Sequence, residues 1–314
     1  MLFSVDTRAV RPPDASQHHV GQLEAGGSTV LFALPRSGVP TVEVVAFPGD
    51  AVPNSMWRPL PGAPGNHPHS GGLLSVLHTK LSQASPEGAA AQHALFVVEP
   101  SHLSSQGFAL YESLLPATTA SGEPAAGYDA RGLPAARQLH GLLAAAWRAS
   151  SADRAQPAVA PPLLACGFSK GGVVCNQLLT ELAHWHDEQP GPGQEAAGPA
   201  AELLARLAAV HLLDAGLACR GAYLTDPAVA EALGRRSASS ELRICLHGTP
   251  RQWRDPSRRW LGEEKERSLA LLRAAGVRVA EKEYFADEPL SLEMHFRCVD
   301  AFELGSLAAG DNDV

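Results

Sequence analysis

A serine flanked by glycines is the residue in this sequence best suited to covalent chemistry. The run Gly167 to Gly171 reads Gly-Phe-Ser-Lys-Gly, with Ser169 at its centre. Glycines two residues before and two after a serine permit the tight strand-to-helix turn that exposes a nucleophilic hydroxyl. The amino terminus of the helix that follows places partial positive charge beside the reacting atom. We therefore predict that Ser169 is a nucleophile and that the backbone N–H of Lys170 stabilises the oxyanion.

The segments on either side of this turn decide how much the pattern means, because short glycine and serine patterns also arise by chance. An apolar run at Pro162–Cys166 predicts a strand before the turn. Apolar residues at helical spacing over Val173–Trp185 predict a helix after it. The alternative is an ordinary glycine-rich turn in which the serine only caps the helix. The strand–turn–helix context favours a nucleophile.

A serine nucleophile needs a histidine as general base and a carboxylate that orients the histidine. In folds with this turn, both follow the serine along the chain, on loops after later strands. His295 is the one histidine after the last predicted strand. We expect it to be the base, the alternative being a solvent-facing residue at the start of a helix. His211 and His247 lie inside predicted strands, which indicates buried structural residues.

Two aspartates are candidates for the carboxylate. Asp214 directly follows the strand Val210–Leu213, and Asp255 lies in the loop after the strand Leu242–Leu246. The position of Asp255 is the more usual one, but this residue can instead pair with a neighbouring arginine or cap a helix at Pro256. Asp214 has fewer competing roles and is preferred, and the choice between the two stays open.

The second oxyanion donor should come from the loop that follows the third strand of the sheet. Thr41–Phe47 predicts a strand that ends at Pro48, so the backbone around Gly49 or Asp50 is expected to supply this N–H. The Asp50 side chain could orient that loop, bind substrate or simply form the turn.

Short apolar strands alternate with helical segments along most of the chain. Besides those named above, we predict strands at Ser28–Leu34, His93–Val98 and Val277–Tyr284, and helices at Leu73–Leu81, Ala135–Ala149, from Glu202, at Glu263–Ala275 and at His295–Leu307. This alternation predicts an α/β fold, α/β-hydrolase-like, with a mostly parallel sheet covered by helices on both faces. Ser28–Leu34 is expected to be an antiparallel edge strand. We expect an irregular N-terminal extension over residues 1–27, a single domain over 28–308 and a tail over 309–314.

Composition excludes several other classes of protein. A net charge of −8 and no basic cluster argue against a nucleic-acid partner, and no apolar run is long enough for a transmembrane segment. The five cysteines are an odd number and widely spaced, which indicates core residues in a reducing compartment. The N-terminus lacks an apolar signal core, so the cytoplasm is the default location. Two pairs of histidines could be metal ligands, His67-Pro-His69 and His184-Trp-His186, but neither has the helical spacing of a known metal site. We predict that they are exposed loop or helix-end residues, and we expect no metal or cofactor.

Several longer motifs resemble one eukaryotic family. They are Phe47-Pro-Gly-Asp50, Gly167-Phe-Ser-Lys-Gly171 continuing to Asn176-Gln-Leu-Leu179, Leu213-Asp214, Thr249-Pro250 with Gln252 and Arg254-Asp-Pro256, and His295-Phe-Arg297. In this order they are similar to the family typified by the human chromosome-2 open-reading-frame-69 protein, over roughly residues 42–303. The resemblance implies an α/β-hydrolase-like fold and, from the animal members, an association with mitochondria. The sequence departs from the family after Asp214, where Ala215-Gly216-Leu217 replaces a more glycine-rich stretch, and at its short N-terminus.

Two functions from different classes fit these residues. The first is a serine hydrolase, like an esterase, lipase or thioesterase, that cleaves an ester, thioester or amide of a small-molecule or lipid acyl substrate through acyl-Ser169. The second is a catalytically silent hydrolase-fold protein that binds a lipid or a protein partner. Serine, acid and histidine candidates in the expected chain order favour the enzyme. A nucleotide-binding function is not supported, because no G-x-G-x-x-G follows the early strands and no P-loop motif occurs.

Overall fold

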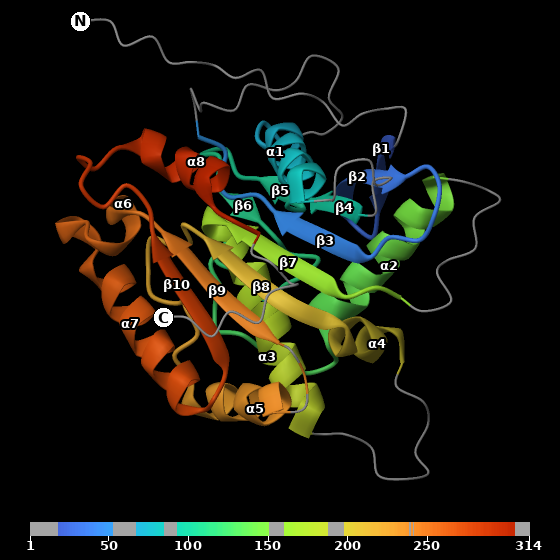
Figure 1. Cartoon of the computed structure of the whole chain (residues 1–314). Helices are drawn as coiled ribbons and strands as arrows, with labels where there is room; N and C mark the ends of the chain where they lie inside the picture. Colours follow the sequence, from blue (N-terminus) through green and yellow to red (C-terminus); the bar gives the residue numbers. More distant parts are fainter. Residues whose placement is uncertain are drawn as a thin grey trace, which may run out of the picture.

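An eight-stranded sheet runs through the centre of the computed structural model, which describes residues 18–52, 67–84, 93–150, 160–187, 198–238, 240 and 242–304 (Figure 1). The strands of this sheet are β1 (His18–Ala25), β2 (Ser28–Pro35), β3 (Val42–Phe47), β4 (His93–Val98), β7 (Leu163–Phe168), β8 (Leu207–Leu213), β9 (Arg243–Gly248) and β10 (Arg278–Glu283). Their order across the sheet is β1-β2-β4-β3-β7-β8-β9-β10. All neighbours from β4 to β10 are parallel, whereas β1 and β2 run antiparallel to their neighbours. A short hairpin, β5 (His102–Leu103) with β6 (Ala109–Leu110), forms a separate two-stranded sheet.

Helices cover both faces of the sheet because the strands are apolar on both faces. Along β3, Val45 and Phe47 belong to one buried cluster, and Val44 and Ala46 belong to the other. This alternation is the period of two expected for a strand. The first cluster is closed by α2 (Pro134–Ser150), α3 (Gly172–Asp187), α4 (Pro199–Ala205), α5 (Pro227–Ala238) and α7 (Arg259–Ala274), and the second by α1 (Ser70–Ala84) and α8 (Leu292–Ala301). The result is a three-layered α/β-hydrolase fold.

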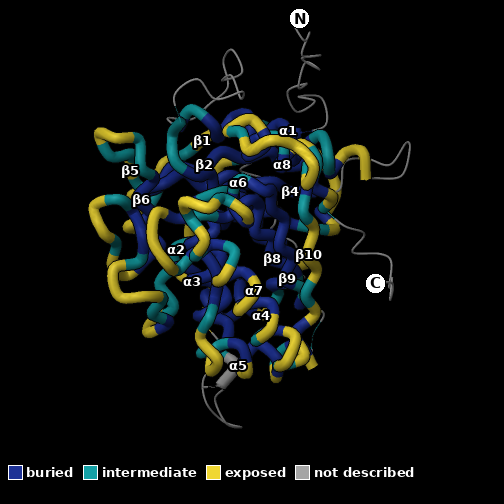
Figure 2. The backbone as a smooth tube through the Cα atoms, turned by 90° about the vertical axis from the view of Figure 1, so that its left-hand side faces the viewer, coloured by how far each residue is buried: buried dark blue, intermediate teal, exposed yellow. Residues whose placement is uncertain are grey.

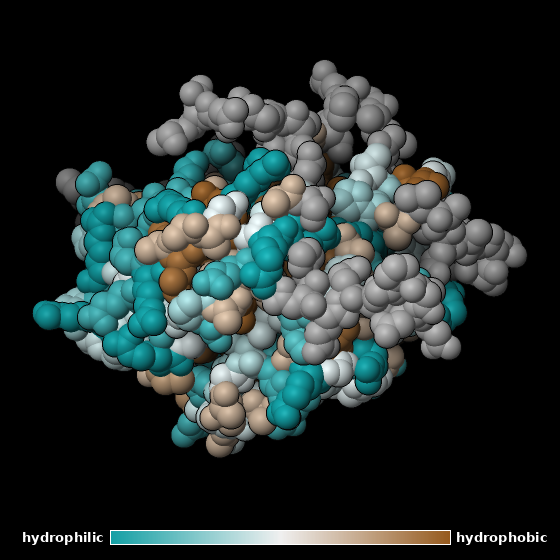
Figure 3. Space-filling model, turned by 90° about the horizontal axis from the view of Figure 1, so that it is seen from below, coloured by the Kyte–Doolittle hydropathy of each residue, from teal (hydrophilic) through white to brown (hydrophobic). Residues whose placement is uncertain are grey.

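Burial follows these layers. Strands such as β4 and β8 are dark blue in Figure 2, whereas the exposed residues lie on the outer turns and helices. On the face shown in Figure 3, hydrophilic side chains cover most of the visible surface, with small groups of hydrophobic ones between them. No helix in the described ranges is both long and apolar enough to span a membrane.

The predicted fold class is confirmed, and the expected strands and helices are present with ends shifted by a few residues. Two expectations were wrong. Residues 18–25 are not irregular but form β1, and β1 rather than Ser28–Pro35 is therefore the antiparallel edge strand. The helix α5 was not predicted, and α8 begins at Leu292 rather than at His295. The tail over 309–314 lies outside the described residues.

Candidate active site

Ser169 stands where the central strand β7 turns into a helix. A single 3-10 turn, Ser169–Gly171, joins β7 to α3. Ser169 has a φ of +53°, a conformation that non-glycine residues adopt rarely, at a cost on the order of 1–3 kcal/mol. Its side chain is partly exposed, whereas Phe168 and Lys170 on either side are buried. The turn therefore holds this one hydroxyl out of the packed interior.

Three glycines make this turn sterically possible. A Cβ at Gly167 would lie 2.6 Å from the Cα of Gly172, and one at Gly171 would collide with the carbonyl oxygen of Phe47. A Cβ at Gly49 would lie 2.5 Å from the Ser169 Cβ and 3.0 Å from its Oγ. The loop after β3 thus packs directly on the Ser169 side chain.

Asp214 and His295 come together at the same edge of the sheet. His295 Nδ1 lies 2.6 Å from Asp214 Oδ2, and both side chains are buried. The His295 ring also packs on the ring of Phe168, the residue before the serine, with 4.6 Å between centroids. Ser291 caps the amino terminus of α8 by accepting a hydrogen bond from the Met294 N–H, which places His295 on the second half of the first turn.

The backbone that follows β8 and β9 fixes the Asp214 carboxylate. Thr249 donates its N–H to Oδ1 at 2.7 Å and its hydroxyl to Oδ2 at 3.1 Å. The Asp214 N–H donates to the His247 carbonyl at 2.6 Å, and Asp214 itself has a φ of +45°. Among the described residues, the hydrogen bonds to this buried carboxylate therefore come from Thr249 and His295.

Asp255, the other acid candidate, has its partners within its own turn. It caps the short helix Pro256–Arg258 by accepting from the N–H and the hydroxyl of Ser257, and it pairs with Arg258 at 3.1 Å. These hydrogen bonds hold the pKa of Asp255 below its usual range. The structure therefore pairs Asp214, rather than Asp255, with His295.

Two buried histidines hold the loop that follows β3. His67 Nε2 lies 2.9 Å from the Gly49 carbonyl, and its Nδ1 accepts the His69 N–H at 3.2 Å. His69 Nε2 accepts the N–H of Val52 at 3.1 Å. Burial lowers the pKa of His67 to about 3 and that of His69 to about 4, so both rings are neutral at pH 7. We expected exposed residues here, and this was wrong, because both rings are buried against the loop that follows β3.

Lys170 and Asp50 join the turn after β7 to the loop after β3 through their side chains. The Lys170 ammonium lies 2.9 Å from Asp50 Oδ1 and donates to the carbonyl of Ser121. The same Asp50 oxygen accepts the N–H of Ala109 at 2.8 Å. The Lys170 side chain is buried beneath residues 108–123, so its charge is directed into this ion pair and not toward Ser169. Asp50 therefore links its own loop to Ala109 and to Lys170.

His211 and His247 are buried, as predicted from their positions in strands. His211 and His247 stack on each other, and His247 Nδ1 lies 3.0 Å from the Tyr284 hydroxyl. Four cysteines are buried, Cys219 is exposed, and all five are free thiols.

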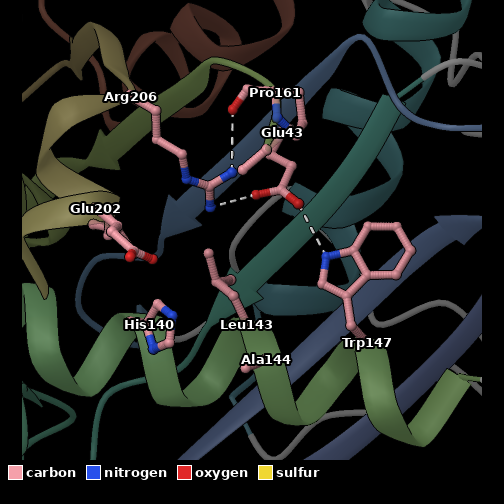
Figure 4. A pocket seen from close by; sticks show the side chains of 10 residues that line it. Glu43, His140, Leu143, Ala144, Trp147, Pro161, Glu202 and Arg206 are labelled. Carbon is pink, nitrogen blue, oxygen red and sulfur yellow. Dashed lines mark hydrogen bonds and ion pairs between the residues drawn. The ribbon is translucent and has the colours of Figure 1, made fainter. Parts of the chain in front are cut away.

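A pocket of about 430 Å³ lies at the other end of the strands (Figure 4). Its polar centre is Glu43, which accepts from the Trp147 indole at 2.9 Å and pairs with Arg206 at 2.7 Å. Glu43 lies near the amino end of β3, and Arg206 immediately precedes β8. Because Ser169 follows the carboxyl end of the parallel strand β7, this pocket is separate from the site around Ser169.

Solved structures similar to this chain include several hydrolases. A putative carboxylesterase from Lactobacillus plantarum matches with a TM-score of 0.44 and 11% identity, covering 92% of this chain and 93% of that one. The acyl-protein thioesterase 2 of Zea mays matches with a TM-score of 0.41 and 16% identity, covering 86% of this chain and 95% of that one. The assignment of the fold follows from the strand order described above.

Sequence relatives share the central part of the chain. The family model described as C2orf69 matches residues 133–278, a range that contains Ser169, Asp214 and Asp255 but not Gly49 or His295. The mitochondrial protein C2orf69 homolog of Danio rerio is 38% identical over 137 residues, 43% of this chain and 36% of that protein. The human protein of this name is 31% identical over 137 residues, 43% of this chain and 32% of that protein. The match thus spans about a third of the length of these relatives. Over residues 133–278, the similarity to the C2orf69 family that the motifs predicted is confirmed.

Proposed function

We propose that this protein is a serine hydrolase that cleaves an ester, thioester or amide through an acyl-Ser169 intermediate. The observation that carries the proposal is the buried hydrogen bond between Asp214 and His295, whose ring packs on Phe168, the residue before the strained and partly exposed Ser169. Serine, histidine and acid come from three different elements, and structural stability alone does not require them at one edge of the sheet. Serine hydrolysis uses this combination of groups.

Asp214 determines which nitrogen of His295 can act as a base. An ionised carboxylate only accepts hydrogen bonds, so His295 Nδ1 carries the proton and donates to Asp214. Nε2 is then left with its lone pair. In the proposed reaction Nε2 takes the proton of the Ser169 hydroxyl as Oγ bonds to the acyl carbon, and then gives it to the leaving group. Water attacks the acyl-enzyme by the same route, which restores Ser169 and releases the acid.

The N–H groups of Lys170 and of the Gly49–Asp50 segment are the proposed oxyanion donors. Lys170 N–H lies in the first turn after β7, where helical N–H groups have no acceptor within the helix. In the Gly49–Asp50 peptide, the carbonyl is bound to His67, and the N–H of a trans peptide points the opposite way. His67 therefore favours the Asp50 N–H, rather than that of Gly49, as the group free to bind the oxyanion. This donor arrangement supports acyl transfer.

The proposed substrate is a broad chemical class and not a single compound. We propose a small-molecule or lipid acyl compound, because the Lys170 ammonium beside the serine is already paired with the carboxylates of Asp50 and Glu123. The names of the sequence relatives suggest a mitochondrial location for this chain as well, which organelle fractionation of the tagged full-length protein would test.

The experiment is hydrolysis of a panel of p-nitrophenyl esters and acyl thioesters of different chain length. The wild type should release a burst of about one equivalent of p-nitrophenol with its best substrate, and Ser169→Ala and His295→Ala should not. Ser257→Ala, an exposed serine in the Asp255 turn, is the control and should match the wild type. Turnover by Ser169→Ala at the wild-type rate would contradict the proposal. Folded wild-type protein that turns over no acyl compound would instead favour the catalytically silent alternative.

A further inference from the structure

Three histidines from separate elements meet inside the protein, away from Ser169. His18 is the first residue of β1, His78 lies in the middle of α1, and His93 is the first residue of β4. Their exposed fractions are only 1%, 6% and 2%. One ring nitrogen from each residue can be chosen so that all three lie within 4.8 Å of one another. The ring centroids are 4.5 to 5.1 Å apart.

The hydrogen bonds recorded within this cluster do not account for its burial. His78 Nδ1 lies 3.0 Å from His93 Nε2, which satisfies one nitrogen of each ring. His93 Nδ1 is buried and has no hydrogen-bond partner among the described residues. A buried polar nitrogen without a partner costs about 1–3 kcal/mol. Three adjacent imidazoles in the interior therefore need a further explanation.

We propose that His18, His78 and His93 bind a divalent transition-metal ion, with Zn²⁺ the best match. Zn²⁺ is held by imidazole nitrogens at about 2.0–2.1 Å in tetrahedral sites, which places the ligand atoms about 3.3 Å apart. The ligand atoms lie within 4.8 Å of one another here, so binding would require the three rings to draw closer together. On binding, the proton shared between His78 and His93 moves to the other nitrogen of its own ring, so that each residue offers a lone pair. A fourth, non-protein ligand such as water completes the tetrahedron.

The state of the rings is compatible with metal binding. In the hydrogen bond between His78 Nδ1 and His93 Nε2, one nitrogen donates and the other accepts, so at least one of these two rings is neutral. Neutral imidazole is the form that binds metal. No carboxylate or thiol belongs to this group of ligands, which favours Zn²⁺ over the oxygen-seeking Ca²⁺ and Mg²⁺.

A second buried group, His211, Cys245 and His247, also has the types of atom that bind metals. There, however, both ring nitrogens of His247 have partners, since Nε2 lies 3.0 Å from His211 Nδ1 and Nδ1 lies 3.0 Å from the Tyr284 hydroxyl. That group is explained by its own hydrogen-bond chain. It serves as the matched control for the first cluster, because it is equally buried and also contains paired histidines.

The position of the cluster indicates a structural role. His93 is at the amino end of β4, whereas Ser169 follows the carboxyl end of β7, so the ion does not take part in acyl transfer. A metal at this point would tie the edge strand β1 to α1 and to the interior strand β4 (Figure 1). It would stabilise the edge of the sheet, where β1 pairs with β2 alone among the strands.

The test is metal binding by the full-length protein, measured with Zn²⁺ and with Co²⁺ after removal of bound metal by a chelator. The wild type should bind one equivalent, the Co²⁺ form should show the visible absorption of a tetrahedral site, and Zn²⁺ should raise the melting temperature. His78→Asn and His93→Asn should weaken binding at least 100-fold and abolish the thermal shift, while His211→Asn should retain both. Circular dichroism establishes which variants are folded. Absence of saturable binding by the folded wild type, or binding unaffected by either substitution, would overturn the proposal.

X-ray absorption on the wild-type zinc form gives a second test that needs no variant. Coordination by three imidazoles and a light fourth ligand, without sulfur, is the expected result. A sulfur ligand would place the ion at Cys245 and contradict the assignment to His18, His78 and His93.

Discussion

Replacing Asp214 with asparagine should disable His295 without displacing it. The carboxylate accepts hydrogen bonds from Thr249 N–H, the Thr249 hydroxyl and His295 Nδ1. An amide keeps one acceptor oxygen but turns an NH₂ group toward either Thr249 or His295. If the oxygen stays with the Thr249 N–H, the NH₂ group faces His295 Nδ1, which then becomes the acceptor. The His295 proton moves to Nε2, the nitrogen that must take the proton of Ser169.

The expected loss of activity follows from this change of the His295 tautomer. The same substitution in an established serine protease triad lowers kcat by about 10⁴-fold, which corresponds to about 5 kcal/mol in the transition state. We expect a loss of that order for Asp214→Asn. The fold should lose less, about 1–3 kcal/mol, because the buried Thr249 hydroxyl loses the oxygen to which it donates. The predicted loss of activity therefore exceeds what partial unfolding at 25 °C would produce.

The assay compares ester hydrolysis with urea unfolding for Asp214→Asn and Asp255→Asn. Asp255 is the matched control, since it is also an aspartate after a strand but binds only Ser257 and Arg258. We expect Asp255→Asn to retain activity within about twofold and stability within about 1 kcal/mol. The reasoning would be refuted if Asp214→Asn kept wild-type turnover, or if Asp255→Asn lost as much activity as Asp214→Asn.

Three further predictions follow from the site and from buried charges. Gly49→Ala places a Cβ 2.5 Å from the Ser169 Cβ, so turnover of the best ester should fall about 100-fold. Circular dichroism should show that the variant is folded. Unchanged kinetics would mean that the loop does not touch the nucleophile. Burial lowers the pKa of His69 and of His211 to about 4, so between pH 6.5 and 4 the unfolded chain holds more protons than the folded one. Stability should then fall with falling pH by about 1.4 kcal/mol per pH unit for each histidine, and urea midpoints that do not change from pH 7 to 5 would argue against it. Burial raises the pKa of Glu181 to about 7, so its ionisation destabilises the folded state as pH rises from 4.5 through 7. Relative to wild type, Glu181→Gln should therefore gain roughly 3 kcal/mol over that range in the same urea series, and a constant difference would contradict it.

Most of the fold could be predicted from the sequence because its central strands are short, apolar and separated by helical segments. β1 escaped prediction because its sequence, His-His-Val-Gly-Gln-Leu-Glu-Ala, has few apolar residues and a glycine in its middle. Such a strand is formed by pairing with β2 and not by its own propensity. The helix α5 was missed for a similar reason, since its apolar face is largely alanine and becomes distinct only against α3 and α7.

The sequence offers candidates for each residue of the site, but it does not specify which aspartate pairs with His295. Asp214 and Asp255 both follow strands, and the sequence does not specify which one a residue 40 or more positions later will contact. The strained turn at Asp214 and the Thr249 backbone direct that carboxylate to His295, and both depend on the neighbouring strands β8 and β9. His67 and His69 were misjudged because their burial depends on packing against the Gly49 loop, a contact with no periodic signal in the sequence.

Covalent labelling with a fluorophosphonate probe tests the central claim most directly, because it reports an activated serine without knowledge of the substrate. Intact mass should show one adduct on the wild type, and peptide mapping should place it on Ser169. Labelling should be absent in Ser169→Ala and strongly slowed in His295→Ala. A folded wild type that remains unlabelled, or an adduct that persists in Ser169→Ala, would contradict the account.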